Sequence, residues 1–295
     1  MIRERLHPAV WMTYYLFVLA IAMFFWNPLL QGIALLGGAL YFATLAGGRA
    51  FLSELGFTLP LAVLVAITNP LFSHAGATPL FFMNGNPVTL EAVLYGILLA
   101  VMILSVLYWC KCLARVMTTD RLLILFGGRL PRLALTFSMT LRYFPRLFRQ
   151  MKEMEAAGKS MGLFAKKSFF DRLRGRMKIL SALVGWSLER AMETSASMKA
   201  RGYGLSGRTN AIRRTLRGED LFFLLACIVL GGLTLLSGFL GGLTFWFYPH
   251  VSALPLSGAS LTGYLSYGSL CFLPVCMEWK EWYQWRILRK KLPRC

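Results

Sequence analysis

Long apolar runs separated by short polar segments set the pattern of this sequence. Each run approaches the roughly 20 residues that a helix needs to cross the hydrocarbon core of a bilayer. The runs lie at about residues 9–26, 29–46, 57–73, 90–113, 220–243 and 256–277. The first run is too long for a signal peptide and further runs follow, so we expect it to be retained. The pattern predicts an all-α integral membrane protein with about six transmembrane helices.

The pattern changes between the fourth and fifth runs. Residues 133–161 and 169–201 carry apolar side chains at every third or fourth position, which predicts two long amphipathic helices. Near the middle of the second helix, small side chains at Ser181, Ala182 and Gly185 suit the close approach of another helix. We therefore expect a helical module here and not a disordered basic segment.

Charge is distributed very unevenly along the chain. The 295 residues include 32 Lys and Arg but only 13 Asp and Glu, and 57% of them are hydrophobic. Residues 111–219 alone hold 23 of the basic and 7 of the acidic residues. Residues 73–89 and 241–256 contain no Lys or Arg, whereas residues 278–295 contain six. A chain that is both apolar and basic is typical of a membrane protein with cytoplasmic basic segments, and no nucleic-acid binding is expected.

This distribution predicts topology and domain organisation, because basic residues accumulate in cytoplasmic loops. We expect a multi-pass protein of the cell membrane with both termini in the cytoplasm. Membrane helices one to four would occupy residues 1–113 and membrane helices five and six residues 220–277. A basic cytoplasmic module at 114–219 and a basic cytoplasmic tail at 278–295 complete the chain. At about 1 kcal/mol per Lys or Arg, anionic lipid headgroups are expected to help seat the basic module.

Catalytic and metal-binding signatures are scarce. The sequence has no phosphate-binding loop of the type G-x-x-x-x-G-K-[ST], so the chain is not expected to hydrolyse ATP itself. Its three histidines are scattered, and its six cysteines lack paired C-x-x-C spacing. We predict no catalytic residues, no metal site and no cofactor in this chain.

Both long helices end in glycine after a basic stretch. The first ends with Lys159, Met161 and Gly162, and the second with Ala200-Arg201-Gly202. Glycine suits the left-handed position that closes a helix, and a cation in the last turn meets the negative end of the helix dipole. These residues could therefore only cap their helices, or they could form exposed tips on which a partner docks.

Several short motifs carry a resemblance to one family. They are Leu6-His7-Pro8, Asn69-Pro70-Leu71-Phe72-Ser73-His74, Thr89-Leu90-Glu91, Thr118-Thr119-Asp120, Leu141-Arg142-Tyr143-Phe144-Pro145, and Glu189-Arg190-Ala191-Met192-Glu193 before Ala200-Arg201-Gly202. Over nearly its whole length the chain resembles the transmembrane T component of energy-coupling factor importers for vitamins and metals. The resemblance implies crossed cytoplasmic coupling helices that end in Ala-Arg-Gly motifs, whose arginines contact two ABC ATPase subunits.

The resemblance also implies a mechanical role without catalysis. The T component would transmit ATP-driven motion of the ATPases, which bind ATP and Mg, to a separate substrate-binding S component in the membrane. Arg201 matches the arginine of the second motif, whereas the first motif has Met161 where the family has arginine, with Lys159 two positions before it. Either Lys159 supplies that contact, or the first tip docks by packing alone. A conventional ABC importer permease and a membrane-embedded enzyme remain as alternative functions.

Overall fold

The computed structural model describes residues 6–73, 76–83, 86–127, 131–162, 169–205, 217–248 and 250–291. It divides into two compact units, the first formed by residues 1–118 with 215–295 and the second by residues 119–214. The charges at Arg3 and Arg5, and His74 of the second motif, lie outside the described residues. Each unit is described by itself.

The first unit is a bundle of apolar helices. They are α2 (Pro8–Phe24), α3 (Pro28–Ala46), α4 (Gly48–Phe72), α5 (Leu90–Val116), α9 (Gly218–Phe239) and α10 (Gly258–Lys291). Of the described helices, α3, α4, α5 and α9 are long and apolar enough to cross a membrane, while α2 is apolar but has 17 residues. The predicted helices are thus present, and the chain is a multi-pass membrane protein.

Side-chain caps fix where these helices start. Asn27 caps α3 by accepting a hydrogen bond from the Leu29 N–H at 3.1 Å, and proline follows as the first helical residue. The buried carboxylate of Asp220 accepts bonds from the backbone N–H groups of Arg217, at 2.9 Å, and His7, at 2.7 Å. One side chain therefore joins the start of α9 to the start of α2.

Aromatic side chains form much of the core of this unit. Trp109 of α5 is completely buried and donates from its indole Nε1 to the carbonyl of Ala34 on α3, at 2.9 Å. Gly38 lies under the same indole, where a Cβ would stand 3.0 Å from Nε1. Tyr14 and Tyr15 of α2 pack edge-on against Trp109, with centroids 6.0 and 6.2 Å away. The Trp109 indole of α5 thus contacts both α2 and α3 in the core.

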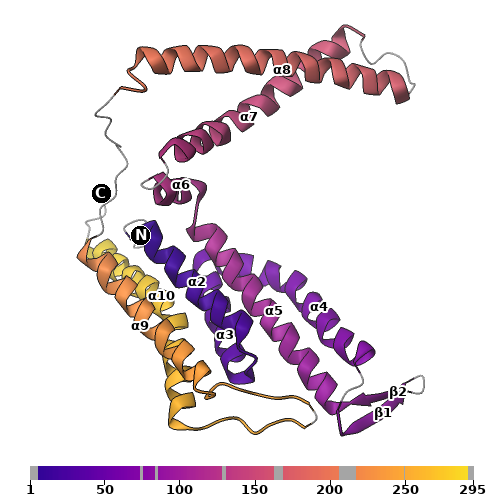
Figure 1. Ribbon diagram of the computed structural model, residues 1–295, viewed down its shortest axis with the longest axis vertical. Helices are drawn as coiled ribbons and strands as arrows, with labels where there is room; N and C mark the ends of the chain where they lie inside the picture. The colour runs from indigo at the N-terminus through magenta and orange to yellow at the C-terminus, as the bar shows by residue number, and fades with distance from the viewer. Residues whose placement is uncertain are drawn as a thin grey trace. The chain divides into compact units, whose positions relative to one another are not determined.

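A two-stranded hairpin corrects the all-α prediction. Strands β1 (Pro79–Met83) and β2 (Asn86–Thr89) pair antiparallel between α4 and α5, with Met83 opposite Asn86. The sequence signal was Asn84-Gly85, a dipeptide typical of two-residue hairpins, between two segments of strand-forming composition. Figure 1 shows the hairpin and the loop between α9 and α10 at the same end of the first unit, opposite the start of α2.

Contacts near the hairpin hold α4 against α5. Asn69 of α4 donates to the carbonyl of Ala92 at 2.8 Å, and Thr78 donates from its hydroxyl to the Glu91 carboxylate at 2.8 Å. The backbones also approach closely here, because a Cβ at Gly96 would clash with the Ala66 carbonyl oxygen. Glycine therefore permits this contact, as small residues do between membrane helices.

Two helices extend beyond the apolar runs from which they were predicted. The third run was placed at 57–73, but α4 already begins at Gly48, because polar residues ahead of the run continue the helix. The sixth run was placed at 256–277, and α10 continues without interruption to Lys291, so most of the predicted basic tail at 278–295 is helical. An apolar window detects only the part of a helix that is uniformly apolar, so it misses such extensions.

The second unit contains α6 (Thr119–Gly127), α7 (Pro131–Ser160) and α8 (Phe169–Ala200). These bounds confirm the two long helices predicted here. Figure 1 shows α7 and α8 crossing. At the crossing Tyr143 stacks on Trp186, with ring centroids 5.9 Å apart. The small residues predicted to allow close approach are not used by α7, since no described atom lies within 4 Å of a Cβ at Gly185.

Candidate functional site

The C-terminal end of α8, here called the second tip, is closed by backbone hydrogen bonds alone. Gly202 adopts a left-handed φ of 83°. Its N–H donates to the Lys199 carbonyl at 3.0 Å, and the Tyr203 N–H reaches back to the Met198 carbonyl at 3.0 Å. This bond pair defines a Schellman motif, which requires a residue without strain at positive φ. Gly202 is therefore explained by the backbone conformation that ends α8.

Arg201 occupies the C-cap position of this motif, and its side chain is exposed. Its own N–H donates to the Ser197 carbonyl at 3.1 Å, so its backbone is satisfied within the helix end. No residue in the described ranges forms an ion pair or a side-chain hydrogen bond with its guanidinium. The five donors of this planar group are therefore available to bind a carboxylate or carbonyl groups.

The C-terminal end of α7, here called the first tip, repeats this geometry with different chemistry. Gly162 has a left-handed φ of 72°, and its N–H donates to the Lys159 carbonyl at 3.1 Å. Met161 thus occupies the C-cap that Arg201 occupies in α8, and its side chain is 79% exposed. The first tip presents a thioether where the second presents a guanidinium.

Lys159 is not at the C-cap position, where the second tip has Arg201. It occupies the position of Lys199, two residues before the C-cap. Its ammonium pairs with Glu155 one turn earlier at 3.1 Å, and the two side chains are 64% and 42% exposed. A pair of this kind contributes only about 0.3–0.5 kcal/mol, so Lys159 is weakly held and could still reach a partner.

The two tips lie on opposite sides of the crossing between α7 and α8 (Figure 1). Both helices also expose apolar side chains at helical spacing, here called the apolar stripe. The stripe comprises Leu133, Phe137, Leu141, Phe144 and Phe148 of α7, and Leu173, Met177, Leu180, Val184, Leu188 and Met192 of α8. Exposed apolar surface of this extent marks an interaction site. The unit therefore presents two separated tips, only the second of which carries an exposed arginine at its C-cap, and exposed apolar residues on both long helices.

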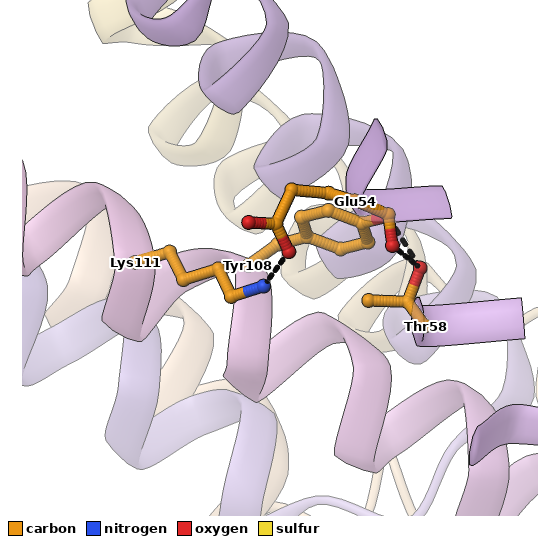
Figure 2. A network of polar contacts seen from close by, with 4 residues as sticks. All are labelled: Glu54, Thr58, Tyr108 and Lys111. Atoms are coloured by element: carbon orange, nitrogen blue, oxygen red, sulfur yellow. Dashed lines mark hydrogen bonds and ion pairs between the residues drawn. The ribbon is translucent and has the colours of Figure 1, made fainter. Parts of the chain in front are cut away.

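The sequence reasoning missed a polar network between α4 and α5. Figure 2 shows that the Lys111 ammonium pairs with the Glu54 carboxylate, while the buried Thr58 hydroxyl lies 3.1 Å from the Tyr108 hydroxyl. Thr58 also donates to the Glu54 carbonyl at 3.0 Å. Glu54 escaped notice because it precedes the apolar window at 57–73. An ionisable residue in a membrane helix was the signal that could have found it.

No group of three or more His, Cys, Asp or Glu side chains in the described ranges is arranged to hold a metal ion.

Comparison with known proteins gives consistent matches. The family described as CbiQ, cobalt transport protein, matches residues 2–211. The energy-coupling factor transporter transmembrane protein EcfT of Bacillus selenitireducens is 28% identical over 262 residues, which cover 81% of this chain and 94% of that protein. The EcfT proteins of Listeria innocua and Bacillus subtilis are 33% and 31% identical over 103 residues, 34% of this chain and 39% of each relative.

Proposed function

The chain belongs to the CbiQ family of cobalt transport proteins, and we propose that it is the transmembrane T component of an energy-coupling factor importer. In this role it transmits ATP-driven motion of two ABC ATPase subunits to a substrate-binding S component in the membrane. ATP and Mg bind to the ATPases, and the S component selects the vitamin or metal. The similarity to EcfT over most of both chains supports this assignment.

The observation that supports the coupling role is that the Arg201 guanidinium is exposed and has no partner among the described residues. If this side chain served only to cap α8, it would contact the last carbonyl groups of the helix. Those carbonyls are instead bonded by the backbone N–H groups of Gly202 and Tyr203, and the described residues leave the guanidinium unpaired. A side chain that its own helix does not require is available for a partner.

An ATPase groove lined by a carboxylate or by backbone carbonyls fits this tip. The guanidinium is planar and forms paired hydrogen bonds, which an ammonium cannot reproduce. The small side chain of Ala200 and the positive φ of Gly202 leave the flanks of Arg201 narrow enough to enter a groove. At the first tip, Met161 and Gly162 dock by packing, with Lys159 as an auxiliary cation.

The apolar stripe supports the second partner of the proposal. Phe137, Phe144 and Phe148 are each about half or more exposed. A membrane-embedded S component offers apolar helix surface that would cover them. The two partners then engage different surfaces, the ATPases at the tips and the S component on the stripe.

The proposal includes a six-span topology. The basic second unit and both termini lie in the cytoplasm, while the hairpin and the loop after α9 lie outside. Residues 73–89 and 241–256 hold no Lys or Arg. The hairpin and the described part of the loop after α9 lie at the same end of the first unit (Figure 1). Two further helices complete the six spans: α2, which has 17 residues, and the apolar part of α10.

Charge reversal at the second tip tests the coupling role. We expect Arg201→Glu to weaken ATPase co-purification by about 2 kcal/mol or more, roughly thirtyfold in dissociation constant, and to abolish uptake. Lys199→Glu is the matched control, because it reverses an equally exposed charge two residues earlier and should change binding by less than about threefold. Both are compared at equal membrane abundance. Normal uptake by Arg201→Glu would overturn the coupling role.

A further inference from the structure

The cytoplasmic end of α10 has a composition unlike the rest of the helix. Residues 278–291 continue the helix beyond its apolar part and contain three Trp, one Tyr, five Lys or Arg, and two Glu. This excess of three positive charges lies directly next to the membrane-embedded part of the same helix. The segment has no role in the proposed coupling to ATPases.

Its aromatic residues share one face. Trp279, Trp282, Tyr283 and Arg286 follow the spacing i, i+3, i+4 and i+7, which places them on the same side of a helix. The three rings are 70%, 59% and 63% exposed, so no described part of the chain covers them. We call these four residues the α10 face.

Arg286 is joined to this face by stacking. Its guanidinium carbon lies 4.7 Å from the centroid of the Trp282 ring. Stacking against an indole orients the guanidinium while leaving its N–H donors exposed. The cation is thereby held at the end of the face that is farther from the membrane-embedded residues.

The order of these residues along the helix matches the order of layers in a membrane surface. Going outward from the apolar part of α10, indole and phenol rings come first and the cation comes next. Trp and Tyr favour the headgroup level of a bilayer, and basic residues just outside a cytoplasmic helix end are attracted to anionic lipids. Of the two glutamates in this segment, Glu281 is partly covered and lies off this face, and Glu278 has one carboxylate oxygen buried.

We propose that the α10 face binds anionic phospholipids of the cytoplasmic leaflet, with the rings among the headgroups and the Arg286 guanidinium on a phosphate. A lipid is favoured over a docked protein because the face is continuous with a helix that already enters the bilayer. The site depends on the proposed topology but not on coupling to ATPases. Its effect is to fix the depth of α10 at the cytoplasmic surface.

Tryptophan quenching by brominated lipid tests this site in the full chain. The protein is reconstituted without partners in phosphatidylcholine bilayers containing phosphatidylglycerol, with either one or the other lipid brominated at the same mole fraction. The tryptophan fluorescence of the α10 face is obtained by subtraction. The fluorescence of the same protein carrying W279F and W282F is subtracted from that of each protein. We expect stronger quenching of this difference by brominated phosphatidylglycerol.

Three variants separate the α10 face from general charge. R286Q should raise the phosphatidylglycerol fraction needed for half-quenching by about fivefold, the factor that corresponds to about 1 kcal/mol for a cation held at the anionic headgroups by the face. R286K should retain most of the preference, and so should K280Q, whose residue neighbours Trp279 but does not share its face. Since no ATPase is present, the result is independent of the Arg201 experiment.

Two outcomes would overturn the proposal. Equal loss of preference in K280Q and R286Q would show a diffuse charge effect instead of a site on this face. Equal quenching by both brominated lipids, or by neither, would show that the face has no preference for anionic lipid or lies away from the bilayer, as a surface for a protein partner would.

Discussion

At the scale of single residues, the two tips differ at one equivalent position. Met161 and Arg201 each precede a glycine with positive φ, and in both helices that glycine donates to the carbonyl three residues earlier. The backbone therefore presents the C-cap side chain in the same way at both ends. The difference between the tips comes from the side chain, so it can be exchanged without disturbing the helix.

We expect Met161→Arg to be tolerated and to strengthen ATPase binding. The side chain is 79% exposed, so the change disturbs no packing, and a cation at a helix C-terminus is favourable. The gain from one exposed charge pair is about 0.2–1 kcal/mol, up to about fivefold in affinity. It is measured by titrating the purified ATPases onto the detergent-solubilised chain.

Lys159→Ala serves as the comparison, because Lys159 occupies the position of Lys199 and is paired with Glu155. We expect less than a twofold change in ATPase affinity. Complete loss of the complex in Lys159→Ala would show instead that this lysine replaces the missing arginine.

Much of the tip geometry could be predicted from sequence, because it is local. A glycine that follows a run of helical periodicity predicts the closure at Gly162 and at Gly202 without reference to the rest of the fold. The state of the Arg201 side chain could not be predicted, because it depends on which groups the folded helix end already satisfies. Its role toward an ATPase remains a prediction.

At the scale of elements, the Glu54–Lys111 pair is an important contact between α4 and α5. The two side chains are 34% and 30% exposed, so they lie between a surface pair and a buried pair. Lys111 also lies 6.0 Å from the centroids of the Phe42 and Phe57 rings, which limits its access to water. Removing one partner leaves the other charge in an apolar neighbourhood.

We expect a double-mutant cycle with Glu54→Gln and Lys111→Met to give a coupling energy of about 1–2 kcal/mol. The double variant should lose less stability than the sum of the losses in the two single variants. Stability is measured by pulse proteolysis during a titration with SDS in mixed micelles.

The exposed pair Arg190–Glu193 on α8 is the reference for this cycle. Its side chains are 54% and 58% exposed, and its coupling should be about 0.5 kcal/mol or less. Equal coupling energies for the two pairs would contradict the role assigned to the Glu54–Lys111 contact.

The elements themselves show where sequence reasoning succeeds and fails. Apolar length predicted the four described helices that are long and apolar enough to cross a membrane, because a bilayer requires that length wherever a helix crosses. The hairpin was missed because its strands are shorter than any window tuned to helices. The stacking of Tyr143 on Trp186 joins residues 43 positions apart, and no local pattern encodes which rings meet.

At the scale of the whole molecule, the charge distribution predicts which loops lie outside the cell. In a background with the exposed Cys110 and Cys276 replaced by serine, cysteines at Phe82 and Ala253 should react with a membrane-impermeant maleimide added to intact cells. Phe82 is 72% exposed on the hairpin and Ala253 is exposed in the loop after α9, so both would be accessible.

A cysteine at the exposed Ser195 of α8 completes this experiment. It should react only after the cells are permeabilised, because the basic second unit is expected in the cytoplasm. Labelling of this position in intact cells would reverse the topology, and with it the accessibility of both tips to ATPases.

The attachment of α4 to α5 has a consequence for motion during transport. These helices are joined near one end by Glu54 and Lys111 and near the other by Asn69, the hairpin and the close approach at Gly96. Two anchors this far apart remove the freedom of one helix to spin or slide along the other. The two helices then move as a single body. Any rearrangement inside the membrane must take place at helix interfaces that are not held at two separate points.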